Sequence, residues 1–431
     1  MLSLAGFSYS DVSKHKTKKT GIWMTYKDNV YDVTGFIDNH PGGNIIMLAA
    51  GNRLEPYWNI YKQHTNNKNI VNDILEPMKI GKLTDYVPYE QCDPYIREPK
   101  RNQLLKFHSI FPCNAETSNI MDNYITPNKL WYIRNHSHVP LVNADNYNIY
   151  INGTEITLKD IKEKFPKNEI ITTIQCAGNR RSEYDPKTSG TQWNYGAIST
   201  AKWGGVWLRD LLNDDSIKGK HVQFESLDSV KISIPIEKAL NPFGDVMLAY
   251  EMNNEDISRD HGYPLRLIVP GYVGIRNLKW IKKIDICDTE ADGPWQSGIS
   301  YRPRRTKDEK IPTIQEYPVQ SVIVEINRYD DNGEKYYVVK GFALSGGGRG
   351  IIRVDVSING GKTWKDAKLR EGSEQNVNKA WAWTFWDITF KETKNMDICC
   401  KATDTSYNTQ PQENKDIWNM RGLINNSWHR V

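Results

Sequence analysis

Apolar and polar residues alternate with a period of two beyond about residue 312, in runs that glycine-rich turns separate. Such alternation turns one face of each run towards a core and the other towards solvent, as in antiparallel strands. The turns contain Gly346-Gly347-Gly348 and Asn359-Gly360-Gly361. The pattern predicts strands over residues 319–326, 335–342, 351–358 and 381–390. Strands at this spacing with glycine turns indicate a β-sandwich of the immunoglobulin-like kind.

Residues 104–304 mix two periods. Short β-branched runs at 169–174 and 265–269 alternate with stretches of helical spacing, such as 206–212. This pattern predicts a mixed α+β domain.

Residues 84–103 carry neither period, because proline and charged residues interrupt every apolar run. We expect this segment to be an unstructured linker that joins two domains without fixing their distance. The chain then divides into a first domain over 1–83, the linker over 84–103, a central domain over 104–304 and a C-terminal domain over 305–431.

The composition is that of a globular protein of several domains, with 431 residues of which 39% are hydrophobic and 11% aromatic. The formal net charge of +4 is too small to imply nucleic-acid or membrane partners. No apolar run approaches the roughly twenty residues of a membrane span. No targeting segment is visible, since residues 1–6 are too short for a signal peptide. Six cysteines without CxxC or zinc spacing make a disulfide framework improbable.

The first domain contains the run His40-Pro41-Gly42-Gly43, and His64 follows it. Together with Trp23-Met24-Thr25-Tyr26 and the run from Asn29 to Thr34, it resembles cytochrome b5 from about Phe7 to Leu83. The resemblance implies an α+β domain in which His40 and His64 bind the iron of a b-type haem. The 23 residues between them are too many for one helical face, so two helical hairpins must clasp the ring. Gly42 and Gly43 suit a loop whose backbone approaches the macrocycle. A capping or core histidine is the alternative at each position.

Cys176 lies close to two arginines in the run Gln175-Cys176-Ala177-Gly178-Asn179-Arg180-Arg181. Neighbouring positive charge stabilises a thiolate, which is the form that binds a metal. A lone cysteine is more commonly buried and inert. The run, however, resembles the sulfite oxidase and eukaryotic nitrate reductase family, in which this cysteine binds the molybdenum of a pyranopterin cofactor.

Further motifs extend this resemblance along the central domain. They are Asn123 to Asn128, Arg134 to Pro140, Trp193 with Gly196 to Ala201, Arg259 to Arg266 and Gly274 to Trp280. A pyranopterin carries a terminal phosphate, so its pocket needs cations and main-chain donors. The predicted cofactor-binding residues are Arg134, His136, Cys176, His261, Arg266, Arg276 and Lys279. For each basic residue the alternative is a solvated surface charge.

Sulfite is a small dianion, and binding it requires several guanidinium donors in a pocket that excludes water. Arg134, Arg181 and Arg421 match the family's sulfite-binding arginines. Trp193 and Tyr301 match the remaining pocket wall, and a tyrosine there can donate a hydrogen bond. With Cys176, these five residues are the candidate catalytic residues.

The haem domain precedes the molybdenum domain, and no reductase module follows before Val431, which resembles the animal-type sulfite oxidases. The resemblance implies oxidation of sulfite to sulfate by oxygen-atom transfer, with electrons passed through the haem to cytochrome c. It also implies a homodimer formed by the C-terminal domain, and the mitochondrial intermembrane space as the location. Two alternatives are a nitrate-reducing molybdenum enzyme with a separate electron donor and a non-catalytic haem-binding module.

The charge of the first domain disagrees with a basic partner such as cytochrome c. Residues 1–83 hold ten Lys/Arg and seven Asp/Glu, so 10 − 7 = +3. A local acidic rim would resolve the disagreement, and Asp38, Glu55, Asp73 and Glu76 are its candidates.

Overall fold

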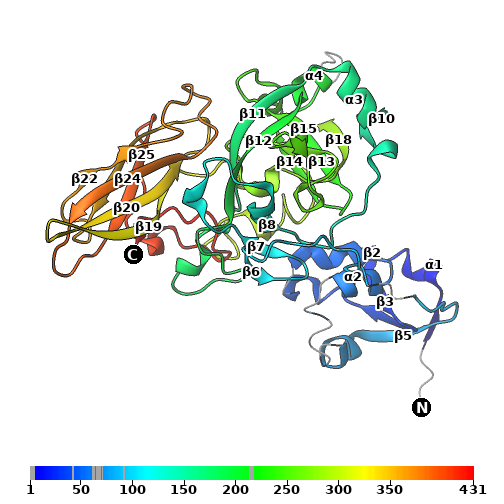
Figure 1. Ribbon diagram of the computed structural model, residues 1–431. Helices are drawn as coiled ribbons and strands as arrows, with labels where there is room; N and C mark the ends of the chain where they lie inside the picture. Colours follow the sequence, from blue (N-terminus) through cyan, green and yellow to red (C-terminus); the bar gives the residue numbers. More distant parts are fainter. Residues whose placement is uncertain are drawn as a thin grey trace.

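Three folded parts follow one another along the chain and remain distinct in Figure 1, coloured blue, teal to green, and yellow to red. The computed structural model describes residues 5–40, 43–60, 64, 69, 71–90, 93–212 and 218–431. Within these residues, every helix is too short or too polar to cross a membrane. The five described cysteines are all free.

The N-terminal part is a small α+β domain around one five-stranded sheet. Its strand order is β1 (Ala5–Phe7), β5 (Lys79–Leu83), β4 (Asn29–Asp32), β3 (Gly21–Tyr26) and β2 (Lys16–Thr17). The helical elements are α1 (Tyr9–Val12), η1 (Ile37–Asn39), η2 (Gly43–Ala49), α2 (Glu55–Ile60), η3 (Val71–Leu75) and η4 (Glu76–Met78). The buried faces of β3 and β4, including Met24 and Tyr31, pack with Ile37 and Leu54 of the helical side. This arrangement confirms the predicted α+β class of the first domain.

The central part contains three sheets and short helices. One sheet has the order β10 (Thr154–Thr157), β9 (Asn148–Ile151), β18 (Ile281–Cys287), β13 (His221–Ser226) and β14 (Lys231–Pro235). A second has the order β11 (Asn168–Gln175), β12 (Ile198–Trp207), β15 (Met247–Met252) and β16 (Glu255–Asp256), with β17 (Arg266–Ile268) paired to β15. The third is β6 (Lys106–Ser109), β7 (Asn114–Glu116) and β8 (Ile133–Arg134). The helices are α3 (Leu158–Lys164), α4 (Leu208–Leu211) and α5 (Ile236–Leu240).

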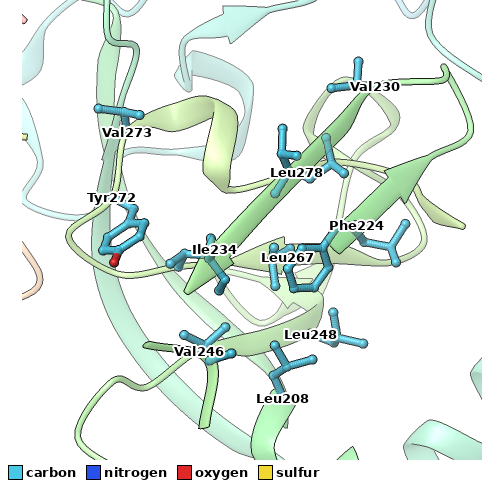
Figure 2. Close-up of a cluster of buried hydrophobic side chains, with 14 of the residues drawn as sticks. Leu208, Phe224, Val230, Ile234, Val246, Leu248, Leu267, Tyr272, Val273 and Leu278 are labelled. Atoms are coloured by element: carbon cyan, nitrogen blue, oxygen red, sulfur yellow. The ribbon is translucent and has the colours of Figure 1, made fainter. Parts of the chain in front are cut away.

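The core of the central part lies between the two larger sheets. Figure 2 shows Phe224 and Ile234 of one sheet gathered with Leu248 and Leu267 of the other. All four side chains are at most 1% exposed. This shared core confirms the mixed α+β architecture and holds the loops at the strand ends in fixed positions.

The predicted helix over 206–212 is wrong at its start. β12 continues to Trp207, and α4 covers only Leu208–Leu211. Val206 and Trp207 pair with β15, so the sheet ladder overrides the helical spacing of this segment.

The C-terminal part consists of two four-stranded antiparallel sheets. One has the order β19 (Gln320–Asp331), β20 (Glu334–Leu344), β24 (Thr384–Lys391) and β23 (Lys368–Leu369). The other has the order β22 (Lys365–Asp366), β21 (Ile351–Ser357), β25 (Cys399–Asp404) and β26 (His429–Arg430). Val339 and Trp386 of the first sheet share a buried cluster with Val354 and Cys400 of the second. The four predicted strands are therefore present, although β19 extends beyond its predicted end and β24 begins at Thr384, after the predicted start at 381.

The segment over 84–103 is only partly the unstructured linker that we expected. Its start packs on the N-terminal domain, because Asp85 accepts a 3.0 Å hydrogen bond from the Tyr9 amide and Val87 accepts one of 2.9 Å from Arg53. Its end packs on the central part. Arg101 is buried between the carboxylates of Glu98 and Asp260, with 2.9 Å contacts to Asp260. Glu98 and Arg101 of this segment therefore belong to a buried ion-pair network with Asp260.

Candidate functional site

Cys176 lies in the loop that follows β11, at the edge of the central core. Its amide donates to the Ala197 carbonyl at 2.9 Å, and its Sγ accepts from the Gly178 amide at 3.5 Å. The side chain is 9% exposed and contributes to a buried cluster with Trp193 and Tyr132. The thiol is thus held rigidly at the wall of a cavity rather than inside an inert core.

One cavity brings most of the predicted cofactor residues together. Its walls come from β8, the Cys176 loop, η9 (Arg259–His261), β17, η10 (Gly274–Arg276) and η11 (Ile299–Tyr301). The predicted residues among its lining are Arg134, His136, Cys176, His261, Arg266, Lys279 and Tyr301. Segments that are distant in sequence therefore form one concave site.

Arg276 is a predicted cofactor residue that this cavity does not include. Its guanidinium is fully buried and donates to the carbonyls of Ile314 and Trp295 at 3.2 Å and to Gln296. It also lies 5.7 Å from the centre of the Tyr301 ring. The prediction for Arg276 needs correction, because its donors are used inside the protein, where they support the wall that carries Tyr301.

The histidines of the cavity are neutral rather than cationic. Burial lowers the pKa of His261 to about 3, and burial followed by the charges of Arg134 and Lys279 holds the pKa of His136 well below its usual range. Burial also lowers the pKa of Lys279 to about 7. These residues can donate hydrogen bonds to a polar cofactor, but the histidines add no positive charge.

Several buried donors fit a polar, anionic group in this region. The Arg266 side chain uses its two terminal nitrogens on the carbonyls of His261 and Asn277, at 2.7 and 2.8 Å. Across the residues that the structure describes, Arg266 Nε, Trp193 Nε1 and Arg421 Nε are buried without a hydrogen-bond partner. Unsatisfied buried donors are costly. Of these three, Arg266 lines the cavity, and an oxygen-rich ligand there, such as a pyranopterin, would satisfy its donor.

Arg134, Arg181 and Arg421 come from three different segments, and the charges of Cys176, Arg134 and Arg421 all act on Arg181. Burial lowers the pKa of Arg181, the Cys176 thiolate opposes this shift, and the charges of Arg134 and Arg421 lower the pKa further. Burial likewise lowers the pKa of Arg421, and Arg134 adds to the effect. Three mutually repelling cations in a desolvated site favour the binding of an anion.

Glycines make room for the Arg181 guanidinium. A Cβ atom at Gly178, Gly190 or Gly422 would lie within 2.8 Å of an Arg181 side-chain atom. Arg181 Nη1 donates to the Thr191 carbonyl at 2.8 Å, and Nε donates to the carbonyls of Arg421 and Gly422. The guanidinium is therefore fixed in one orientation.

Arg180 does not share this arrangement, although the sequence pattern treated both arginines as neighbours of the thiolate. Its side chain is fully buried and binds the Glu183 carboxylate in a fork, at 2.8 and 2.6 Å. Glu183 compensates its charge. Arg181, by contrast, has no carboxylate in such a fork among the described residues, and the charge of Cys176 acts on its pKa.

Tyr301 and Tyr132 place two phenols at the cavity. Burial, and then the charge of Cys176, raises the pKa of Tyr301 to about 12, and the same two causes raise that of Tyr132. Both phenols are neutral donors at neutral pH. Tyr132 was missed by the sequence reasoning, although it lies two residues before Arg134, on the same side of the extended chain.

Asp228 and Asp260 were missed as well. Asp260 lines the cavity and accepts hydrogen bonds from Arg101 and from Asn135 at 2.9 Å. Asp228 also lines it, and burial raises the pKa of its carboxyl. The only signal for Asp260 was its place in the Arg259-to-Arg266 motif, beside His261.

His40 and His64 face each other in the N-terminal domain. Their ring centres are 6.2 Å apart and their planes differ by 31°. Two metal–imidazole bonds of about 2 Å plus the half-widths of the rings give a similar separation, so an iron atom fits between them. Burial, and then the neighbouring His40, lowers the pKa of His64 to about 4, which keeps its imidazole neutral. Gly42 of the predicted loop lies outside the described residues.

The four candidates for a local acidic rim on the N-terminal domain differ in exposure and in pairing. Glu55 is only 4% exposed and accepts a 2.7 Å hydrogen bond from the Lys27 amide. Asp38 forms an ion pair with Lys18 at 2.9 Å, and Glu76 forms one with Lys79 at 3.3 Å. Of the four candidates, Asp73 is exposed and has no ion pair among the described residues.

Family models match each of the three folded parts. A cytochrome b5-like heme/steroid binding domain matches residues 8–84. An oxidoreductase molybdopterin binding domain matches residues 136–295, and a Mo-co oxidoreductase dimerisation domain matches residues 311–431.

Two curated relatives and one solved structure extend these matches. The chain is 42% identical to the mitochondrial sulfite oxidase of Rattus norvegicus, covering 99% of this chain and 83% of the relative. It is 39% identical to the sulfite oxidase of Gallus gallus, covering 98% and 99%. The sulfane dehydrogenase SoxCD of Paracoccus pantotrophus superposes with a TM-score of 0.63 at 25% identity, covering 84% of this chain and 96% of that one.

Proposed function

The chain belongs to the sulfite oxidase family and is a molybdenum-dependent sulfite-oxidising enzyme. On this premise, we propose that it oxidises sulfite to sulfate by oxygen-atom transfer. We also propose that it passes the electrons through its haem to cytochrome c. The observation that carries the proposal is the buried Arg181, whose guanidinium donates to the Arg421 carbonyl and whose pKa responds to the charges of Cys176, Arg134 and Arg421. Desolvated guanidinium groups of this number suit a small dianion.

A molybdenum pyranopterin bound in the cavity would supply the oxygen-atom transfer. A haem bound in the N-terminal domain would supply one-electron transfer. Cys176 is proposed as the protein ligand of the molybdenum. Arg266, His261, His136 and Lys279 are proposed to hold the organic part of the cofactor. The partnerless Nε of Arg266 supports this assignment, because a buried guanidinium donor needs an acceptor.

The residues of this chain bind and orient the substrate. Arg181 cannot turn away from the site, because three glycines and three carbonyls surround its guanidinium. Trp193 is fully buried in the cluster that contains Cys176, so it excludes water from this wall. Tyr301 keeps its proton at neutral pH, since its pKa is about 12, and can donate a hydrogen bond to a substrate or product oxygen. Preorganised donors of this kind need no rearrangement during the reaction.

The electron path is proposed to run from the molybdenum site to the haem held by His40 and His64 and then to cytochrome c. The paired or buried state of Glu55, Asp38 and Glu76 does not favour a strongly acidic docking rim. Surface ion pairs are weak, however, and can exchange partners on docking. The acceptor rests on the family resemblance.

The same premise extends to assembly and location. We propose a homodimer, in which the open edge strand β19 offers a surface for a two-fold contact. We further propose that the C-terminal sheets form an immunoglobulin-like sandwich. The domain limits 1–83, 84–103, 104–304 and 305–431 remain a proposal, as does the mitochondrial intermembrane space, which the names of the relatives favour only as far as the mitochondrion.

One experiment separates the proposal from its alternatives. The purified protein is analysed for molybdenum and iron and then mixed with sulfite or, with reduced viologen, with nitrate. We expect both metals, sulfite-dependent reduction of the haem and no nitrate turnover. Nitrate turnover without sulfite oxidation would favour the nitrate-reducing alternative, and haem without molybdenum would favour the binding module.

A further inference from the structure

The end of the chain lies along the loop that carries Cys176, about 245 positions earlier in the sequence. The Ile424 amide donates to the Ala177 carbonyl at 2.6 Å, and the Arg180 carbonyl accepts from Asn425 Nδ2 at 3.1 Å. Further hydrogen bonds, from Arg180 and Asn425, join the same two segments. The loop and the C-terminal segment therefore form one packed unit.

Arg180 and Glu183 are the ionic centre of this unit. Besides its fork to Glu183, Arg180 Nη1 donates to the Ser427 carbonyl at 2.8 Å. The Arg180 backbone has φ 62° and ψ 22°, a left-handed conformation that is unfavourable for a residue with a side chain. A conformation of this kind persists only where its surroundings enforce it, and here the C-terminal segment supplies many of those surroundings.

Asn425 completes the arrangement. Its side chain is 1% exposed and donates to the Arg180 carbonyl and, at 3.4 Å, to Glu183. Its Oδ1 accepts from the Ser427 amide at 3.1 Å and the Ser427 hydroxyl at 2.9 Å. One amide thus joins the strained loop to the turn of the C-terminal segment.

The segment is anchored in both sheets of the C-terminal domain. His429 lies in β26, which pairs with β25. Its Nδ1 accepts a 3.2 Å hydrogen bond from the Ile323 amide of β19, in the other sheet. A displacement of this domain therefore pulls on the Arg180 junction.

The same loop holds the substrate-binding arginine. Arg181 follows Arg180 directly, and its Nε donates to the carbonyls of Arg421 and Gly422, at 3.0 and 3.1 Å. A shift of the loop would move Cys176, Arg181 and Arg421 relative to one another. Misplacement by about 1 Å is enough to reduce catalysis by two orders of magnitude.

We propose that Arg180, Glu183 and Asn425 are positioning residues that clamp the Cys176 loop to the C-terminal domain and set the sulfite-binding arginines. The inference rests on the proposed function, because it takes sulfite as the ligand of Arg181. It assigns the two adjacent arginines different tasks: Arg181 faces the anion, whereas Arg180 holds the loop.

The test uses the full-length holoenzyme with Glu183→Gln, which removes the charge but keeps the shape, and Asn425→Ser, which shortens the amide link. The matched control is Asp387→Asn, because Asp387 also binds an arginine in a fork, in the C-terminal domain and away from the Cys176 loop. We expect both clamp variants to raise the sulfite KM about tenfold with a smaller change in kcat. Amide hydrogen exchange over residues 176–184 should also become faster, while the control matches the wild type.

The exchange measurement separates this inference from the proposed function, because it does not require turnover. A wild-type enzyme that fails to oxidise sulfite would refute the function, and the exchange comparison would still test the clamp. Unchanged KM together with unchanged exchange over 176–184 would overturn the inference. A lowered unfolding temperature without either change would also overturn it, since the residues would then serve stability alone.

Discussion

The haem site and the cavity around Cys176 differ in how their residues are collected. His40 and His64 lie within one small domain, with 23 residues between them, and their rings meet across one gap. The cavity region collects Arg134, Cys176, Tyr301 and Arg421 from segments almost 290 positions apart, including the end of the C-terminal domain. The first site depends on one local fold, whereas the second depends on the correct packing of two.

The two sites also differ in the charge of their residues. The His64 ring is buried and neutral, as a metal ligand must be, and needs no compensating charge. Around Cys176 the site concentrates cations, and burial, followed by the charges of neighbouring arginines, lowers the pKa of Arg181 and Arg421. Such a cluster stores unfavourable energy that an anion relieves, so it must be held together by the surrounding fold.

The largest expected effect follows from replacing the thiolate. Cys176→Ser should abolish sulfite oxidation, because a hydroxyl is poorly ionised and is a harder ligand than a thiolate. The haem absorbance should persist, because the haem site is assembled within its own domain. Steady-state assays and an absorbance spectrum on one sample check both statements, and normal turnover would refute the assignment of Cys176.

Replacing His64 should affect the two activities in the opposite way. His64→Ala should remove the haem spectrum and sulfite-dependent reduction of cytochrome c. Oxidation of sulfite with an artificial acceptor that reacts at the molybdenum site should remain, since His64 contributes nothing to that cavity. Loss of both activities, with an unchanged molybdenum content, would show that the two sites are not independent.

The arginine cluster should govern substrate affinity. Arg421→Met and Arg134→Gln should each raise the sulfite KM by roughly tenfold to a hundredfold, because a charge-assisted contact in a desolvated site contributes about 1.5–3 kcal/mol. Lys18→Met, which removes an exposed cation of the haem domain, is a suitable control. An unchanged KM in both arginine variants would remove them from the substrate site.

The connection between the two domains should limit electron transfer moderately. Among the described residues, Pro88, Tyr89 and Glu90 are exposed and lie between the contacts that fix Asp85 and those that fix Arg101. Deleting Pro88 to Glu90 should slow haem reduction, because the haem domain must move towards the central domain, and added viscogen should do the same. If the flash-photolysis rate of haem reduction is the same after the deletion and with viscogen, the haem and the molybdenum site lie at a fixed distance that already allows electron transfer.

The smallest effect concerns acid stability. Burial lowers the pKa of His429 to about 4, so the folded state binds its proton less readily than the unfolded state, whose pKa is about 6.5. The contribution of His429 to the free energy of unfolding is complete above about pH 6.5. It decreases as the pH falls towards 4, by at most about 1.4 kcal/mol per pH unit. His429→Gln should flatten this part of the pH dependence in denaturant unfolding. An identical pH slope in wild type and variant would contradict the assignment.

The sequence predicted best those features that one local pattern encodes. Long alternation predicted the strands β19, β20, β21 and β24, and the run at His40 with the later His64 predicted a pair of histidines whose rings the fold brings together. Helical spacing failed at Val206 and Trp207, where pairing with β15 decides the structure. Local patterns carry no information about which distant strand completes a ladder.

The remaining errors concern partners that are distant in sequence. Arg180 and Arg276 look like free cations in the sequence. In the structure, Arg180 donates to the Glu183 carboxylate and Arg276 donates to main-chain carbonyls. The proline-rich charged segment ends in a buried pair because Asp260 lies opposite Arg101. Tyr132 carries no motif of its own, and only the folded cavity reveals that its phenol lies at the site.

The most direct test of two separate sites joined in one enzyme is an anaerobic stopped-flow measurement of haem absorbance after mixing with sulfite. The wild-type haem should be reduced by sulfite, whereas the haem of Cys176→Ser should stay oxidised with sulfite and be reduced by dithionite. Reduction of the variant haem by sulfite at the wild-type rate would show that electrons reach the haem without the site at Cys176, and would contradict the account.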